Sequence, residues 1–280
     1  MCANMAATRP TAPDLFKCIE AMKREVAEHR GTHPALLERL TLRADELQAD
    51  RYALDSALAD QGNEFIKEGM KILLHGSSGA LATGGFGMSL GAVKASKNSG
   101  KQGVSVVIVE ARPDMAGGRV GAYEALKSGI KTAVCADSAV GHVLQQKLVD
   151  CVIVDAMKVA GNGDAACAAG TYQIAVLCQL VNIPFYVMTT CASVDVSSPS
   201  ADVFITAEKN AAMLRQVGPG RSAVTVIHKS ASLINPAFDR TPAAMITAII
   251  TEEGPAMPAQ NGQFVDALRE KLQVARAKRQ

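Results

Sequence analysis

From Lys71 onward the chain alternates between short runs of apolar residues and longer amphipathic or alanine-rich segments. The short runs are apolar at successive positions, which is typical of strands that helices cover on both faces. Alternating strands and helices of this kind form a parallel, doubly wound α/β sheet with right-handed crossovers. We therefore predict a Rossmann-like α/β domain over residues 71–280. The predicted strands are 71–75, 104–111, 131–137, 151–156, 183–190 and 223–228, and the predicted helices are 79–98, 116–128, 138–147, 164–181 and about 206–215.

Residues 1–70 show helical rather than strand periodicity. Apolar residues recur at three- and four-residue spacing, which predicts an amphipathic helix, and the pattern continues over 33–66, where we expect two helices. The segment is expected to be a small helical module that packs against the α/β domain. The residues of the first stripe are Leu15, Phe16, Ile19, Met22 and Val26.

Composition argues against several classes of function. The formal charge of +2 comes with no basic stripe or aromatic platform, so we expect no nucleic-acid partner. The apolar runs are too short to span a membrane, and the start of the chain lacks the apolar core of a secretory signal. The seven cysteines form no CxxC pair, which indicates a reducing cytoplasm rather than a disulfide framework or a zinc site. We expect no bound metal.

Ligands of doubly wound sheets bind where the strands reach their carboxyl ends. The loop GSSGALATGGFG follows the first predicted strand and offers Ser77, Ser78 and Gly79 ahead of a helix, which would suit an anion. A tight strand-to-helix turn is an equally open interpretation. The loop matches neither GxGxxG nor GxxxxGKS/T, so we expect no dinucleotide or nucleoside triphosphate cofactor. The residues expected at this edge are His75 to Ser78, Glu110 to Arg112, Asp137, Asp155 with Lys158, and Thr189 to Cys191.

Six segments occur together in an order that resembles one known family. They are TRPTAPDLF, HGSSGALATGGFGMSLG, VEARPDMAGGRVGAYEAL, VIVDAMKVAGNGDAACAAGTYQIAVL, IPFYV and INPAFDRTPAAMITAIITEEG. They resemble the methylthioribose-1-phosphate isomerases of methionine salvage. That superfamily includes ribose-1,5-bisphosphate isomerase and the regulatory α, β and δ subunits of eukaryotic translation initiation factor 2B. The resemblance covers the chain from Arg9 to about Gly254 and implies the same fold and pairing into dimers.

The chain carries other residues where this family holds its catalytic groups. The resemblance places Gly76 at the family's catalytic cysteine and Met157 at its catalytic aspartate. Ala116 stands where the family binds substrate with a glutamine, and Cys167 with Ala168 replaces an asparagine–lysine pair. An arginine-bearing RGAPAIG segment of the family would precede this chain's first residue. Family-type residues that the resemblance implies for substrate binding remain at Arg9, Arg112, Arg119, Asn162 and Asp164.

These differences favour a catalytically degenerate member of the superfamily that acts as a binding or assembly subunit. Moving hydrogen between two sugar carbons needs groups that exchange protons, and neither glycine nor methionine supplies one. Such a subunit would pair with itself or with a homologous chain, as a homodimer or heterodimer, and would retain at most a sugar-phosphate ligand.

Two other functions stay open. An active aldose–ketose isomerase would use Asp155 and Cys167 as a displaced carboxylate–thiol pair, with a helix N-terminus lowering the pKa of the thiol. If these residues instead have only structural roles, Asp155 caps a strand end and Cys167 is present only because a small side chain is needed. Asn162 and Asp164 then cap a helix that begins near residue 164. A regulatory subunit in translation initiation is the third possibility.

Overall fold

A computed structural model describes residues 2–8, 13–76, 78–205, 209–218 and 222–278 of the chain. The central sheet contains β1 (Lys71–His75), β2 (Ser105–Val109), β3 (Lys131–Cys135), β4 (Cys151–Ala160), β6 (Phe185–Met188), β11 (Ala248–Thr251) and β12 (Gly254–Ala256). Its order is β12-β11-β6-β4-β1-β2-β3, and all neighbours are parallel except β11 and β12. The predicted doubly wound sheet is confirmed.

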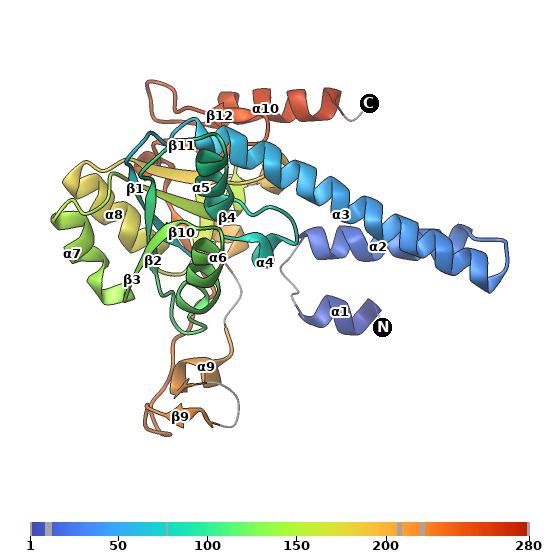
Figure 1. Ribbon diagram of the computed structural model, residues 1–280, viewed down its shortest axis with the longest axis horizontal. Coiled ribbons are helices and arrows are strands. Elements are labelled where there is room, and N and C mark those ends of the chain that lie inside the picture. The colour runs from blue at the N-terminus through green and yellow to red at the C-terminus, as the bar shows by residue number, and fades with distance from the viewer. Residues whose placement is uncertain (1, 9–12, 77, 206–208, 219–221, 279–280) are drawn as a thin grey trace.

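Helices cover both faces of this sheet (Figure 1). α5 (Ser89–Asn98) and α6 (Ala122–Lys127) pack on one face, and α7 (Val140–Gln145) and α8 (Thr171–Val181) on the other. On β1, Ile72 and Leu74 join the core under α5 and α6, whereas Leu73 joins the core under α7 and α8. Because successive strand residues point to opposite faces, a strand buried on both sides must be apolar throughout, as the sequence indicates.

Shorter elements extend the sheet and connect its parts. β5 (Ala165–Ala168) pairs with the far end of β4 and with β10 (Phe238–Thr241), and β7 (Val194–Asp195) also pairs with β4. β8 (Gln216–Val217) and β9 (Val224–Thr225) form a separate antiparallel pair. The remaining elements are α4 (Ala80–Thr83), η1 (Gly117–Gly121), η2 (Asp137–Ala139), η3 (Cys191–Ser193), η4 (Ala201–Phe204), α9 (Ala211–Arg215), η6 (Ala243–Met245) and α10 (Val265–Ala277).

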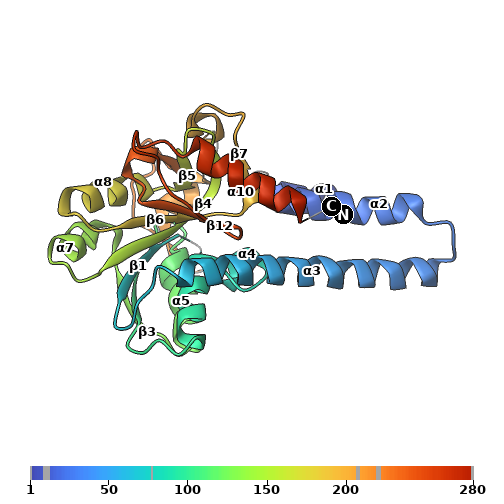
Figure 2. The same ribbon diagram turned by 90° about the horizontal axis from the view of Figure 1, so that it is seen from above.

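The first part of the chain is helical, as predicted, with α1 (Cys2–Thr8), α2 (Pro13–Glu28) and α3 (His33–Asn63). Figure 2 shows α2 and α3 running side by side and extending beyond the sheet. The prediction of two helices over 33–66 was wrong, because the segment contains no proline or glycine between its first turn and Gly62 to interrupt it. Leu58 and Ala59, near the end of α3, are buried against the sheet face that α5 covers.

Two predicted helices have different boundaries in the structure. The helix expected over 79–98 is divided into α4 and α5, since Gly84 and Gly87 between them have positive φ angles. The helix expected over 164–181 begins only at Thr171, after Gly170 at φ +101°, and its expected first turn is instead strand β5.

The predicted strand 223–228 does not join the central sheet. Only β9 forms there, and both of its residues are exposed. The place beside β6 belongs to β11, all four of whose residues are buried. The helix expected at about 206–215 is reduced to α9, with 206–208 outside the described residues.

Within the described ranges, no helix is long and apolar enough to cross a membrane.

Replacing Leu58 by alanine should lower the free energy of unfolding by about 2–5 kcal/mol, because the side chain is fully buried between α3 and the sheet. Leu42→Ala on the same helix is the matched control, since Leu42 is 60% exposed and its loss should change stability by about 0.5 kcal/mol or less. Urea denaturation of both variants checks this. Equal losses of unfolding free energy in the two variants would mean that the part of α3 around Leu42 is packed against other residues in solution.

Candidate functional site

The topological switch point of the sheet lies between β1 and β4. The chain leaves β1 toward β2 and β3 on one side and returns to β4 on the other. His75 at the end of β1 pairs with Val154, so the next residues, Gly76 and Asp155, stand beside each other at the carboxyl edge. A doubly wound sheet binds its ligands at such a point.

Gly76 and Ala168, two positions that the resemblance assigns to the family's site, meet here without titratable side chains. A Cβ atom on Gly76 would lie 3.3 Å from the Cβ of Ala168, so these two positions face each other across the site. The backbone of Gly76 has φ +89°, a region that side-chain-bearing residues rarely adopt. Met157 packs against a small cluster with Phe204 and Ile205. None of these side chains can carry a proton.

Cys167 is not at a helix N-terminus, so the expectation of a lowered thiol pKa was wrong. The residue lies on β5, opposite Ala156 of β4 and Asp239 of β10, and is fully buried. Burial raises the pKa of the Cys167 thiol, and the carboxylates of Asp239 and Asp155 raise it further. The thiol therefore stays protonated and is a poor nucleophile or base.

Asp155 caps a helix. Its Oδ1 accepts a hydrogen bond of 2.9 Å from the backbone N–H of Ser89, the first residue of α5. Its Oδ2 is buried and has no hydrogen-bond partner among the described residues. Burial raises the pKa of Asp155 to about 7, against the opposing effect of the Ser89 N–H. Asp155 and Cys167 are thus brought together, but the Asp155 carboxylate disfavours ionisation of the Cys167 thiol.

The glycine-rich loop holds a carboxylate of the chain itself. Glu124 of α6 accepts hydrogen bonds from the backbone N–H groups of Ala80 and Leu81, at 2.7 and 3.2 Å. A Cβ atom on Gly79 would collide with this carboxylate, so glycine is required for the approach. The position expected to hold a ligand anion is therefore filled by Glu124, and Gly79 has an extended backbone just before α4. Ser78 is buried, and Ser77, like Arg9, lies outside the described residues.

Side chains of α3 hold the same loop in place. Asp55, which is fully buried, accepts hydrogen bonds from the hydroxyl of Thr83 at 2.5 Å and from the backbone N–H of Gly87 at 3.2 Å. Arg51 forms ion pairs with Asp55 at 2.8 Å and with Asp14 of α2 at 2.6 Å. Nothing in the sequence distinguishes Asp55 and Glu124 as site residues, because each lies in an ordinary amphipathic helix pattern.

Asp239 caps α8 from the distant strand β10. Its carboxylate accepts hydrogen bonds from the backbone N–H groups of Gly170 at 2.7 Å and Tyr172 at 3.1 Å. Burial raises the pKa of Asp239 to about 6. In the sequence, Asp239 is marked only by its position in the NPAFD segment. Carboxylates of the chain thus occupy three helix N-termini: Glu124 that of α4, Asp155 that of α5 and Asp239 that of α8.

Asn162 and Asp164 do not cap a helix, contrary to the prediction, because strand β5 follows them. Asn162 Oδ1 accepts a hydrogen bond of 2.9 Å from the backbone N–H of Asp164. Asp164 Oδ1 accepts one of 2.9 Å from the backbone N–H of Ala243, and Oδ2 lies 3.8 Å from the guanidinium of Arg240. Asn162 thus closes the β4–β5 turn, and Asp164 ties this turn to β10 and to the segment that follows it.

His75 also has a structural role. Its Nε2 lies 3.0 Å from the carbonyl oxygen of Ala169, and its Nδ1 is buried without a partner in the described part of the chain. Burial lowers the pKa of His75, so the imidazole is neutral. The described residues hold no group of three or more His, Cys, Asp or Glu arranged to bind a metal ion.

A cavity of about 420 Å³ opens beside the switch point, over the ends of β2 and β3 and the start of α8. Arg112 lines it; its guanidinium donates to the carbonyl oxygen of Leu214 at 3.3 Å, and its backbone N–H donates to Asp137 at 3.0 Å. Glu110, Asp137, Gln173 and Asn235 line the same cavity. One guanidinium among carboxylates and amides suits a ligand with several hydroxyl groups and one anionic group.

Two other family-type positions lie outside that cavity. Arg119 is exposed on η1, and Ala116 precedes the same turn.

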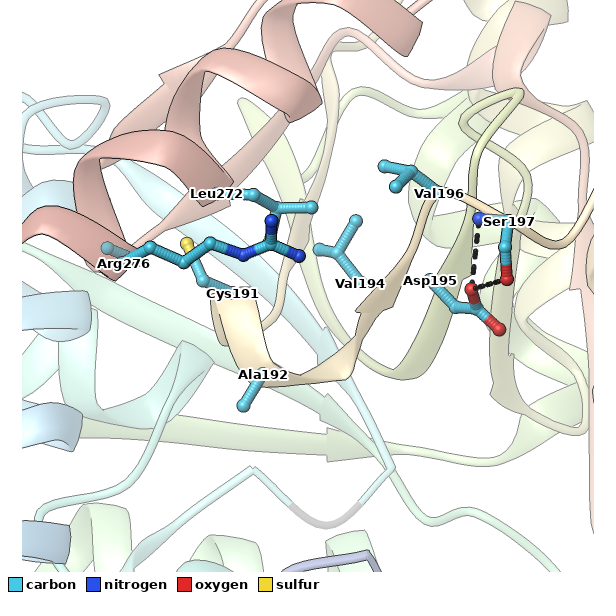
Figure 3. A pocket seen from close by; sticks show the side chains of 9 residues that line it. Cys191, Ala192, Val194, Asp195, Val196, Ser197, Leu272 and Arg276 are labelled. Atoms are coloured by element: carbon cyan, nitrogen blue, oxygen red, sulfur yellow. Dashed lines mark hydrogen bonds between the residues drawn. The ribbon is translucent and has the colours of Figure 1, made fainter. Parts of the chain in front are cut away.

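A second cavity, of about 380 Å³, lies between η3, β7 and α10 and contains none of the candidate catalytic or substrate-binding residues. Figure 3 shows Arg276 reaching across it from α10, and Asp195 turned toward Ser197. Hydrogen bonds from Ser197 and Ser198 lower the pKa of Asp195 to about 2. This carboxylate is satisfied locally and is not paired with Arg276.

The stability of the chain should depend on the ionisation of Asp155. A folded-state pKa of about 7, above the unfolded value of about 3.9, means that its stabilising contribution is present below pH 4 and is lost as the pH rises to 7. Asp155→Asn keeps the acceptor for Ser89 but cannot ionise. The variant should therefore gain stability relative to wild type between pH 5 and pH 8, by about 1.4 kcal/mol for each unit of pKa shift.

Urea denaturation at both pH values measures this difference, and the exposed Asp60→Asn variant is the control. A stability difference between Asp155→Asn and wild type that stays constant with pH would show that Asp155 is ionised throughout.

Residues 1–258 match the Initiation factor 2 subunit family. A methylthioribose-1-phosphate isomerase of Syntrophotalea carbinolica is 39% identical over 255 residues, which cover 91% of this chain and 73% of the relative. The crystal structure of a 5-methylthioribose 1-phosphate isomerase from Pyrococcus horikoshii OT3 is similar, with a TM-score of 0.82 and 30% identity over 96% of this chain and 73% of that one. Translation initiation factor eIF-2B subunit delta from A. fulgidus gives a TM-score of 0.83 and 30% identity over 94% and 75%. The chain therefore belongs to the Initiation factor 2 subunit family and is a relative of the methylthioribose-1-phosphate isomerases.

Proposed function

We propose that this chain is a catalytically degenerate relative of the methylthioribose-1-phosphate isomerases that acts as a ligand-binding or assembly subunit. The observation that carries the proposal is that Gly76 and Ala168 face each other at the switch point, and that neither they nor Met157 on β4 can exchange a proton. Aldose–ketose isomerisation requires an acid and a base within hydrogen-bond reach of two neighbouring carbons. The side chains that we propose have replaced those groups leave the fold intact, but they leave isomerisation without an acid and a base.

The groups that remain nearby are committed to the structure. Asp155 caps α5, Asp239 caps α8, and the Cys167 thiol is buried with a raised pKa. Recruiting Asp155 as a base would release the N–H of Ser89 at the start of α5, which costs about 1 kcal/mol or more for a buried donor. These commitments support the proposal over an active site on relocated groups.

The ligand of such a subunit would bind in the cavity that Arg112 lines. Its volume of about 420 Å³ lies in the range of small-molecule sites, and its polar lining fits a sugar phosphate. The helix N-termini nearby already hold Glu124, Asp155 and Asp239, so Arg112 would supply the principal contact to the anionic group.

An active isomerase is the second candidate. It is supported by the 39% identity to an enzyme of that name and by the buried Oδ2 of Asp155, which lies near Cys167 and has no hydrogen-bond partner within the described part of the chain. The similarity to a subunit of a translation initiation factor supports a third role, in which the chain assembles with homologous subunits.

The seven cysteines are free, which supports a cytoplasmic location. We also propose that residues 1–70 serve the 71–280 domain as a packing module, through Asp55 and its hold on the loop after β1.

The purified chain should not convert methylthioribose 1-phosphate to its ketose isomer above the rate in buffer, with the Syntrophotalea carbinolica enzyme assayed in parallel. Phosphorus NMR of the reaction mixture follows both sugars. Turnover that disappears in Cys167→Ala but survives in Cys178→Ala, another buried thiol, would replace the proposal with the relocated active site.

Replacing Arg112 by alanine should weaken sugar-phosphate binding about tenfold to one hundredfold, because a hydrogen bond to a charged group contributes about 1.5–3 kcal/mol. Thermal-shift titration with methylthioribose 1-phosphate and ribose 1,5-bisphosphate measures the effect. Arg24→Ala, an exposed arginine on α2, is the control and should bind as wild type does. Unchanged binding in Arg112→Ala would place the ligand elsewhere.

A further inference from the structure

The cavity between η3, β7 and α10 has no part in the function proposed above. It has a volume of about 380 Å³ and shares no lining residue with the cavity that contains Arg112. A volume of this size lies in the range of sites for small molecules. The cavity can therefore be considered as a separate binding site.

The walls of this cavity are fixed by the fold. β7 pairs with the far end of β4, and the backbone N–H of Cys191 in η3 donates a hydrogen bond of 2.8 Å to Glu252. On the other side, Phe264 and Leu268 hold α10 against the main hydrophobic core. Because each wall is attached to the core, the cavity exists without a ligand, as small-molecule sites usually do.

One part of the lining is apolar. Val194 and Val196 of the β7 segment face Leu272 and Ala275 of α10 across the cavity. Val194 and Val196 also pack against the core behind them, so their positions are fixed. This part of the cavity would bury a small aliphatic group and exclude water from it.

The α10 wall contributes a positive charge. Figure 3 shows the side chain of Arg276 extending from α10 across the cavity. Among the residues that the structure describes, its guanidinium has no ion-pair or hydrogen-bond partner. A guanidinium offers a planar fork of N–H donors, which matches the two oxygens of a carboxylate.

The β7 wall contributes a negative charge. Asp195 Oδ1 accepts hydrogen bonds from the backbone N–H and the hydroxyl of Ser197, and Oδ2 accepts one from the hydroxyl of Ser198. These bonds hold the pKa of Asp195 at about 2, so the group is charged at neutral pH. A carboxylate accepts about four hydrogen bonds, which leaves Oδ2 able to accept one more.

We propose that this cavity binds a free α-amino acid with an apolar side chain. The α-carboxylate accepts hydrogen bonds from Arg276, the α-ammonium donates to Asp195 Oδ2, and the side chain packs against Val194 and Leu272. Arg276 and Asp195 line the same cavity but do not pair with each other. A molecule that carries both charges on one carbon atom bridges them.

The two charges also exclude simpler ligands. A carboxylate without an ammonium group would bind Arg276 but would place its negative charge near Asp195. An amine without a carboxylate would bind Asp195 but would place its positive charge near Arg276. Both ligands meet a like charge that the amino acid neutralises, so the cavity discriminates against them.

Isothermal titration calorimetry of the full chain tests the ligand class with L-leucine and L-methionine as probes. Each should bind saturably, with one molecule per chain. Two analogues of leucine, 4-methylpentanoate without the ammonium and 3-methylbutylamine without the carboxylate, should each bind at least about tenfold more weakly, because each loses a charge-assisted hydrogen bond. No saturable binding of either amino acid, or equal affinities for L-leucine and 4-methylpentanoate, would overturn the proposal.

A pair of variants tests the place of binding. Arg276→Gln should weaken L-leucine binding about tenfold to one hundredfold, because glutamine cannot form the charged fork. Arg269→Gln is the matched control, since Arg269 is exposed on the same helix but does not line the cavity, and it should bind L-leucine as wild type does. Both substitutions are on the surface, so the fold should be retained.

Equal affinities of Arg276→Gln and wild type for L-leucine would show that the amino acid binds elsewhere. These outcomes are separate from those for the proposed function. Isomerase turnover or a loss of sugar-phosphate binding in Arg112→Ala concerns the other cavity, with which this one shares no residue.

Discussion

Three helix N-termini along the carboxyl edge of the sheet hold carboxylates of the chain itself. Glu124 caps α4, Asp155 caps α5 and Asp239 caps α8. The first backbone N–H groups of a helix have no partner within the helix and attract negative charge, so each cap fixes the loop that precedes its helix. The shape of the candidate site depends on these three contacts. They also use the donors that would otherwise bind a ligand phosphate.

Burial sets the chemistry of the same groups. Asp155 and Asp239 accept hydrogen bonds, which favours their charged forms, yet burial is the larger effect and raises both pKa values toward neutrality. The Cys167 thiol is affected in the same direction by burial and by both carboxylates. The edge of the sheet therefore keeps its titratable groups in structural roles, and the side chains of Gly76 and Met157 cannot exchange a proton.

Much of the fold could be predicted because strands buried on both faces leave a continuous apolar run in the sequence. The errors occurred where local patterns were ambiguous. The alanine-rich stretch with Cys167 resembles a helix start, but its pairing with β10 makes it a strand. Residues 223–228 and β11 have similar local patterns, and only burial against β6 distinguishes them. In the site, the residue types at Gly76 and Met157 can be read from the sequence, whereas the contacts of Glu124 and Asp55 with the loop after β1 cannot.

The sequence by itself determined the doubly wound sheet, the family and the absence of proton-carrying side chains at Gly76 and Met157, because apolar periodicity and side-chain identity are local properties. Only the tertiary structure decided which groups fill the helix N-termini and whether Cys167 is reactive. Glu124 is 44 residues from Ala80, and Asp239 is 69 residues from Gly170. Contacts over such separations depend on how the whole chain packs, and burial, which sets the pKa of each group, follows from the same packing.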